Sequence, residues 1–322
     1  MNRTPFRWRK RGLVFRVADH SAARPWLHAF AQGPATLVMD DVVRVYFSCR
    51  PPPDAQGRFT SQTAFVDLDR GDLTRIVRVA ERPVLSLGGL GCFDEFGIYP
   101  FSPIRTENGL LALYGGWTRC ESVPYTVAIG ACRSGDGGES FERLGPGPVL
   151  GSSIEDPFEV SGPKLRRYGK EWHLWYVAGV RWHRDSGRPE TIFKLKHATS
   201  ADGLHWVRDN RNIMPDAIGE DECQASPDVV TFGGEHHMFF CFKHGTDFRG
   251  NARGYRIGYA HSDDLQHWHR RDDLAGLEPS PDGWDAQATG YPHVFSLDGN
   301  LHMLYIGNDF GREGFGLATL EG

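Results

Sequence analysis

The sequence has few cysteines and no long apolar run, and these two absences narrow the kind of protein it can encode. Its six cysteines form no CxxC pair and no small-scaffold spacing, so we expect reduced thiols and no disulfide framework. No apolar segment approaches the ~18 residues that a membrane span needs. The first residues, MNRTPFRWRKRG, lack the apolar run of a signal peptide. We therefore expect a cytoplasmic protein without a membrane partner.

Positive charge and cofactor motifs are also scarce. The chain has 36 Lys and Arg against 41 Asp and Glu, and the resulting net charge of −5 argues against nucleic acid as a partner. It contains no P-loop, no Gly-rich dinucleotide fingerprint, no Ser-His-Asp elbow and no zinc-ligand spacing. We therefore expect neither a cofactor nor a metal ion, and the oligomeric state is left open.

A short turn motif occurs three times. Residues 134–141 read Ser-x-Asp-x-Gly-x-x-Phe, and related motifs end at Trp206 and Trp268, which lie 62 positions apart. Asp and Gly close tight turns, with the Asp side chain accepting backbone N–H groups, so we interpret these motifs as structural. A repeat of this length indicates several copies of one small unit.

Two further landmarks recur with a similar period. Five predicted strands run into an aromatic residue, in steps of 68, 62, 64 and 65: Tyr46, Tyr114, Tyr176, Phe240 and Tyr305. Before each lies a predicted strand led by a proline, in steps of 69, 60, 64 and 65: Pro34, Pro103, Pro163, Pro227 and Pro292. Proline is tolerated at the first residue of a strand. A third strand precedes each Asp turn and a fourth follows it, so each unit has the four strands of a propeller blade.

These units predict an all-β fold: a five-bladed β-propeller of four-stranded antiparallel blades, formed by residues 1–322 as one domain. The predicted blades cover about residues 28–85, 94–150, 155–214, 220–278 and 285–320. The fifth unit stops where its fourth strand should begin, and residues 8–15 resemble residues 206–213. We therefore expect residues 6–15 to supply the missing strand and close the ring.

The loops at one end of the predicted ring hold the candidate ligand-binding residues. In an up-and-down blade, the start of the first strand and the end of the second lie on the same side. Aromatic, Arg, His and Asn side chains in these loops suit a polar, ring-shaped ligand such as a sugar; the alternative is a set of ordinary solvated loops. The substrate-binding candidates are Arg50, Trp117, Arg119, Arg181, Trp182, His183, His244, Asp285, Gln287 and Asn308.

Acidic residues precede four of the five prolines. Asp94, Asp156 and Glu222 lie at odd offsets from their prolines, so in a regular strand they would share a face. Carboxylates that converge on the axis fit glycosidic-bond chemistry, in which one acid protonates the leaving oxygen and another carboxylate activates water or attacks the sugar. Crowding would raise the pKa of one of them. Each acid taken alone could equally be a surface turn carboxylate.

In its Pro-led strands, Asp turns and acids at blade starts, the sequence resembles the five-bladed propeller glycosidases. These are the arabinanase, β-xylosidase, invertase and levansucrase group, with the mannoside phosphorylases as relatives. The sequence is most similar to glycosidase-like propellers of bacterial polysaccharide gene clusters. The resemblance implies a carbohydrate or sugar-conjugate ligand and a catalytic set in the order Asp, Asp, Glu. Here that set is Asp94 as base or nucleophile, Asp156 orienting the sugar and Glu222 as general acid, one blade later than in the group.

Two alternatives to hydrolysis remain open. The first is a glycoside phosphorylase in which Arg50, Arg119, Arg181 and His183 hold phosphate as the attacking group. The second is a carbohydrate-binding propeller without catalytic activity.

Overall fold

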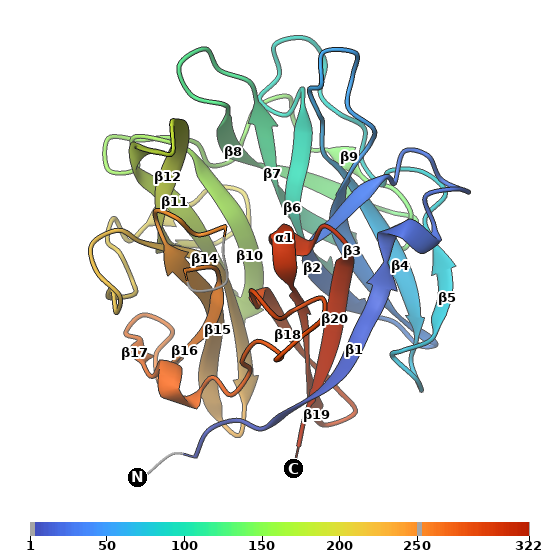
Figure 1. The fold of residues 1–322 in the computed structure, drawn as a ribbon, viewed down its shortest axis with the longest axis vertical. Helices are drawn as coiled ribbons and strands as arrows, with labels where there is room; N and C mark the ends of the chain where they lie inside the picture. The colour runs from blue at the N-terminus through green and yellow to red at the C-terminus, as the bar shows by residue number, and fades with distance from the viewer. Residues whose placement is uncertain (1–3, 250–252, 322) are drawn as a thin grey trace.

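The protein is a ring of five antiparallel sheets with four strands each (Figure 1). The computed structural model describes residues 4–249 and 253–321. The strand order in every sheet follows a single up-and-down pattern, and this confirms the predicted five-bladed β-propeller.

The first four blades each use four consecutive strands. Blade one contains β2 (Ala29–Val38), β3 (Val42–Arg50), β4 (Gln62–Asp69) and β5 (Ile76–Val79). Blade two contains β6 (Gly97–Thr106), β7 (Gly109–Thr118), β8 (Thr126–Ser134) and β9 (Glu142–Arg143). Blade three contains β10 (Val160–Tyr168), β11 (Glu171–Asp185), β12 (Arg188–Ser200) and β13 (Val207–Arg208). Blade four contains β14 (Glu222–Phe232), β15 (Glu235–His244), β16 (Arg256–Ser262) and β17 (His269–Arg270).

Blade five joins the two ends of the chain. It contains β18 (Gly290–Leu297), β19 (Asn300–Ile306), β20 (Gly314–Leu320) and, as its outermost strand, β1 (Trp8–Arg16). β1 pairs antiparallel with β20 along its length, and the two lie side by side in Figure 1. This confirms the predicted closure by the N-terminal strand. Phe15 of β1 is fully buried, with its ring centroid 4.7 Å from that of Phe47 in blade one, so the closing strand also packs against the next blade.

Within the residues that the structure describes, helical structure is confined to three short segments. They are η1 (Val17–Asp19), η2 (Asp272–Leu274) and α1 (Asn308–Gly311), and within α1 both Asp309 and Phe310 have positive φ. Among the helices of the described residues, none has the length and apolar character needed to cross a membrane.

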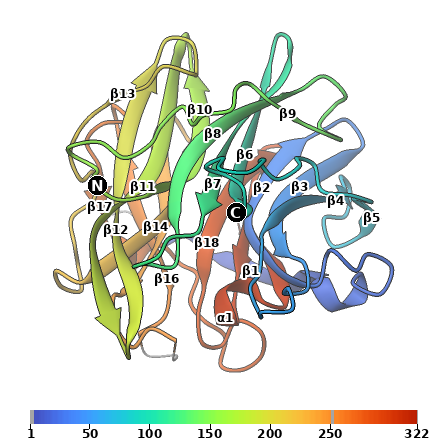
Figure 2. The same cartoon turned by 90° about the horizontal axis from the view of Figure 1, so that it is seen from above.

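The first strands of the blades, β2, β6, β10, β14 and β18, contact one another around the ring and so line its axis. Each of them starts opposite the end of the second strand of its blade, as predicted, for example Gly97 opposite Trp117. The longest hairpin, β11 with β12, points toward the side of the ring that carries α1 (Figure 2).

Each axial strand contains a β-bulge made of a proline and the residue directly before it. In all five blades the register shifts so that two residues face one on the second strand. The bulges are Gly33-Pro34, Tyr99-Pro100, Gly162-Pro163, Ser226-Pro227 and Tyr291-Pro292. Four of the residues before proline have a positive φ of 51–64°, and the Tyr99–Pro100 peptide bond is cis. A bulge interrupts the hydrogen-bond ladder, so the missing N–H of proline costs nothing there.

The bulges correct two details of the predicted repeat. The prolines lie inside the axial strands and do not begin them. In blade two the repeating proline is Pro100, whereas Pro103 lies farther along β6. Sequence spacing alone selected Pro103 because both prolines fall near the expected period.

The axis is filled beyond the bulges. The residue that follows each repeating proline is buried, with an exposure of 4% or less: Ala35, Phe101, Lys164, Asp228 and His293. Nζ of Lys164 in blade three lies 3.5 Å from Nδ1 of His293 in blade five, so side chains of non-neighbouring blades meet across the axis beyond the bulges.

The three Asp motifs form the turns between the third and fourth strands, as predicted. In blade three, Oδ1 of Asp202 accepts the backbone N–H groups of Leu204 and His205, each at 2.9 Å. Because strand direction alternates, these turns lie at the end of the ring opposite the starts of the axial strands. They are structural elements remote from the bulges.

We expect Phe15→Ala to destabilise the ring strongly because the side chain fills the contact between the closing strand and blade one. Truncating a buried Phe typically costs about 3–5 kcal/mol of unfolding free energy, and urea unfolding would measure the loss. Arg9→Ala, at an exposed position of the same strand, is the matched control and should change stability little. Equal stability of the two variants would contradict the role given to β1.

Candidate functional site

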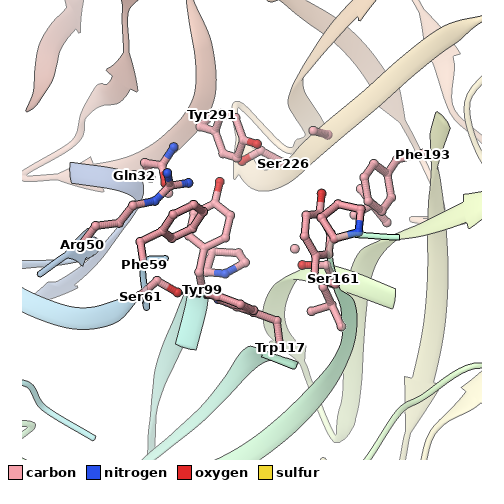
Figure 3. Close-up of a pocket in the computed structure, with 18 of the residues that line it drawn as sticks. Gln32, Arg50, Phe59, Ser61, Tyr99, Trp117, Ser161, Phe193, Ser226 and Tyr291 are labelled. Carbon is pink, nitrogen blue, oxygen red and sulfur yellow. Dashed lines mark hydrogen bonds between the residues drawn. The ribbon is translucent and has the colours of Figure 1, made fainter. Parts of the chain in front are cut away.

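A cavity lies on the axis at the end of the ring where the axial strands begin. It has two adjoining lobes, a first lobe of about 550 Å³ and a second lobe of about 740 Å³. Both lobes are lined by Gln32, Arg50, Phe59, Tyr99, Pro124, Tyr125, Phe193, Tyr255 and Tyr291. Figure 3 shows labelled side chains from different blades pointing into this common space.

The bulges form the floor of the first lobe. Gly33, Tyr99, Gly162, Ser226 and Tyr291 line it, each standing directly before its proline. Position 33 favours glycine for two reasons: its φ is positive, and a Cβ there would lie only 2.9 Å from Cβ of Pro100. Bulges re-aim side chains and are frequent beside functional sites, so this ring of bulges is what turns axial residues toward the cavity.

Tyrosines provide the main polar and aromatic surface of the cavity. The ring centroid of Tyr291 lies 6.2 Å from that of Tyr99 and 5.5 Å from that of Tyr255. Burial, and then the neighbouring tyrosines and cysteines, raises the pKa of all three well above the ordinary value. Their hydroxyls therefore stay neutral at physiological pH and can both donate and accept hydrogen bonds.

An ionic group from three blades lies beneath the floor. Asp228 is fully buried, pairs with Arg166 and lies 2.8 Å from Nδ1 of His293. Nε2 of His293 accepts the backbone N–H of Thr36 at 2.9 Å. Burial opposes the charge on Asp228, but Lys164, His293 and Arg166 outweigh it and lower the pKa of the carboxyl. Burial also lowers the pKa of Lys164, whose side chain lines the first lobe.

Two carboxyl groups lie close to Tyr125, which lines both lobes. Burial, and then the negative charges of Glu159 and Glu190, raises the pKa of Tyr125. Glu190 lines the second lobe and pairs with Arg249. Glu159 is buried behind Thr191, whose hydroxyl donates to it at 2.6 Å. Burial raises the pKa of Glu159 even though hydrogen bonds from Thr191 and Trp182 oppose the shift.

Four of the ten predicted substrate-binding residues line the cavity: Arg50, Trp117, Arg119 and Gln287. The other six do not line either lobe: Arg181, Trp182, His183, His244, Asp285 and Asn308. Several of these hold loops in place. The side chain of Asn308 accepts the backbone N–H of Gln287 at 2.7 Å, and Nε2 of His183 lies 2.9 Å from the carbonyl oxygen of Gly245.

The predicted catalytic residues Asp94 and Asp156 belong to a repeated contact that we call the carboxylate clasp. In each clasp an acid on the segment leading into a blade accepts from a tyrosine of the second strand and from a cation of the outermost strand. Asp94 accepts from Tyr114 at 2.9 Å and Arg143 at 2.7 Å. Asp156 accepts from Tyr176 at 2.9 Å and Arg208 at 2.8 Å.

Blade five has the same clasp, made with the closing strand. Asp285 accepts from Tyr305 at 2.9 Å and pairs with Lys10 of β1 at 2.7 Å. Blade four has Phe240 in place of the tyrosine, and there Glu222 pairs with Arg270 of β17 at 2.6 Å.

The structure does not bring Asp94, Asp156 and Glu222 together. Each is buried and bonded within its own blade, and none of them lines the cavity. Burial alone would raise the pKa of Glu222, but hydrogen bonds from Arg270 and the backbone N–H of Ala217 lower it. A general acid needs a raised pKa, so this environment favours an ionised, structural carboxylate.

Sequence reasoning missed several residues that line the cavity, among them Tyr99, Lys164, Tyr255 and Tyr291. The sequence did contain a signal for three of these four residues, because each adjoins a proline at a bulge. A regular strand gives positions beside a proline no distinct side-chain direction, so the assumption of regular strands hides this signal.

Comparison with known sequences identifies close relatives over the full length of the protein. No protein-family profile matches it. Two proteins of Mycobacterium tuberculosis are each 35% identical over 318 residues, which is 98% of this sequence and 99% of theirs. They are Uncharacterized protein MT1551 of strain CDC 1551 and Uncharacterized protein Rv1502 of strain H37Rv.

Solved glycoside hydrolases and a phosphorylase-family protein share the fold. A structure described as a glycoside hydrolase has a TM-score of 0.75 at 16% identity, covering 99% of this protein and 92% of its own length. A glycosyl hydrolase from Bacteroides ovatus has a TM-score of 0.71 at 14% identity, covering 98% and 93%. A member of the GH130 family of mannoside phosphorylases, which contains hydrolases of β-1,2 mannosidic linkages, has a TM-score of 0.67 at 13% identity, covering 99% and 95%.

We expect Asp156→Asn to lower stability and to leave ligand affinity unchanged, because the carboxylate serves a clasp and not the cavity. Removing one partner of a buried ion pair typically costs about 3–5 kcal/mol, measurable by urea unfolding. Glu155→Gln, at the exposed neighbouring position, is the matched control. A variant of full stability that had lost catalytic turnover would instead support the predicted catalytic role of Asp156.

The lowered pKa of Glu222 predicts a specific acid sensitivity. Its contribution to stability should be complete above its ordinary value of about 4.5 and should be lost as the pH falls through its lower folded value. Wild-type stability should therefore decrease as the pH falls below about 4.5. Glu222→Gln should be less stable at pH 7 and should show a shallower decrease; parallel curves would contradict the assignment.

Proposed function

The protein belongs to the family of these mycobacterial proteins, and from this membership and its glycosidase-like fold we propose that it binds an oligosaccharide or sugar conjugate in the axial cavity and cleaves a glycosidic bond. The observation that carries the proposal is the cavity itself. It is concave, lies on the axis, and combines aromatic faces with a few convergent polar groups, as small-molecule sites do.

The lining residues suit a sugar. Rings such as those of Tyr99, Tyr291 and Trp117 offer flat surfaces for the C–H faces of a pyranose or furanose. The hydroxyls of Ser161 and Ser226 and the tyrosine hydroxyls can exchange hydrogen bonds with the sugar hydroxyls. This combination would fix the orientation of a ring-shaped ligand.

The carboxyl groups beside Tyr125 supply acid and base. Glu159 has a raised pKa, so it retains a proton closer to neutral pH than an ordinary glutamate, and the Thr191 hydroxyl connects it to the second lobe. Glu190 lines that lobe, as does Asp309, and Glu190 is the lining carboxylate close to Tyr125. We assign proton supply to protonated Glu159 through Thr191, whose hydroxyl would accept the carboxyl proton while donating its own to the leaving oxygen. We assign activation of water or stabilisation of the developing positive charge to Glu190.

Phosphorolysis is the second candidate. Arg50 and Arg119 line the cavity, so phosphate could replace water as the attacking group. The two reactions differ in one requirement, because a phosphorylase releases a sugar phosphate and needs inorganic phosphate, whereas a hydrolase does not.

A screen for cleavage of oligosaccharides and sugar conjugates, with and without phosphate, tests the proposal. On any substrate that is cleaved, Glu159→Gln and Glu190→Gln should each lower the rate by about 10²–10⁴ while the ligand still binds. Glu220→Gln, at an exposed position outside the cavity, is the control and should keep full activity. Full activity of both cavity variants would contradict the assignment of these carboxyls. Sugar binding without cleavage of any substrate would leave the propeller as a carbohydrate-binding protein.

A further inference from the structure

The cavity carries more positive charge than its carboxylates can balance. Its lining cations are Arg50 in both lobes, Arg58, Arg119 and Lys164 in the first, and Arg188, Lys243, Arg249 and Arg312 in the second. Among the described residues, its lining acids are Glu190 and Asp309, both in the second lobe. The whole protein has a net charge of −5, so the positive cavity is a local feature and not a consequence of composition.

One of these cations is buried without a carboxylate partner. Lys243 is 6% exposed, and in the described part of the chain it forms no ion pair with an acid. Its Nζ lies 3.1 Å from the ring centroid of Phe248, and burial lowers the pKa of the amine. Lys164, which is 4% exposed, lies instead under the influence of the negative charge of Asp228. A buried charge without a partner is costly, so an anionic ligand beside Lys243 would be stabilised.

Arg50 has the most defined geometry. The carbon of its guanidinium lies 4.2 Å from the ring centroid of Phe30 and 3.9 Å from that of Phe59. Two aromatic rings therefore hold the side chain through cation–π contacts. The N–H groups at the edge of the guanidinium remain available to bind a ligand in the guanidinium plane. Its Nε is buried without a hydrogen-bond acceptor, and the side chain points toward Gln32 and Tyr291 in Figure 3.

From these contacts we propose that the cavity takes an anionic carbohydrate, whose phosphate or carboxylate group binds at Arg50 with Lys243 as a second cation. A planar guanidinium held at its faces presents parallel N–H groups that match the oxygens of either anion. The nearby hydroxyls of Tyr99 and Tyr291 can donate to the remaining oxygens. This inference rests on the proposed function, since it names the class of sugar that the same cavity binds.

Calorimetric titration of the intact protein with four probes tests the inference: inorganic phosphate, glucose 1-phosphate, glucuronic acid and glucose. At least one anionic sugar should bind tenfold or more tightly than glucose, and its affinity should fall as salt rises, because an ion pair is screened. Binding of inorganic phosphate as tightly as the sugar phosphate would support an anion site at Arg50 that is filled by free phosphate. Equal affinities for glucose and both anionic sugars would overturn the proposal.

Variants separate the anion site from the rest of the cavity. Arg50→Met should weaken anion binding at least tenfold and glucose binding much less, whereas Arg50→Lys should retain part of the anion affinity. Lys243→Met gives an independent test of the second cation, and Arg133→Met, at an exposed position of β8, is the matched control. Undiminished anion binding by Arg50→Met would overturn the assignment. Cleavage of neutral sugars by the wild type, together with equal binding of anionic and neutral sugars, would overturn this inference and leave the proposed function standing. Failure of all sugars to bind would remove the proposed function itself.

Discussion

The pairing of β1 with β20 is the contact on which the ring depends, because it joins the two ends of the protein in one sheet. If blade five were made only of consecutive C-terminal residues, the backbone would not link it to blade one. Because β1 belongs to blade five and is followed in the sequence by β2 of blade one, the backbone ties the last blade to the first. Lys10 of β1 adds a side-chain contact to this pairing, because it completes the clasp with Asp285 and Tyr305 of blade five. The same clasp recurs in blades two and three with arginines, so the N-terminal strand replaces a fourth strand in chemistry as well as in position.

The acids of the clasps and the Pro bulges have different structural roles in the ring. The clasps bond one oxygen of Asp94 and one oxygen of Asp156 within single blades, and they fix the segments that lead into the axial strands. The Pro bulges then break the regular alternation of those strands and turn residues such as Tyr291 and Ser226 toward the cavity. A positive φ at these two non-glycine residues is an unfavourable conformation, and the surrounding sheets hold it.

The sequence was sufficient for the architecture and insufficient for the site, and the reason is physical. The number of blades and the closure of the ring are predicted from the repeat period, and an error of a few residues, such as the choice of Pro103 over Pro100, leaves that period unchanged. The direction of a side chain cannot be predicted with the same error, because a single extra residue in a strand reverses the face of every residue beyond it. Asp94 and Asp156 precede β6 and β10, outside any regular strand, so the alternation rule did not apply to them, and they lie in clasps. Arg50 and Trp117 line the cavity from the ends of regular second strands. Glu159 and Lys164 could not be distinguished by sequence from ordinary surface residues.

The buried layer beyond the bulges, from Ala35 through Lys164 and Asp228 to His293, makes the cavity a well and not a tunnel. An extended polymer cannot thread through such a shape, so only one end of it, or a short molecule, can reach the bottom. Under the proposed function, any product formed there would leave by the mouth through which the ligand entered. The depth of the well would then limit how many sugar units are bound at once, independently of the length of the polymer outside.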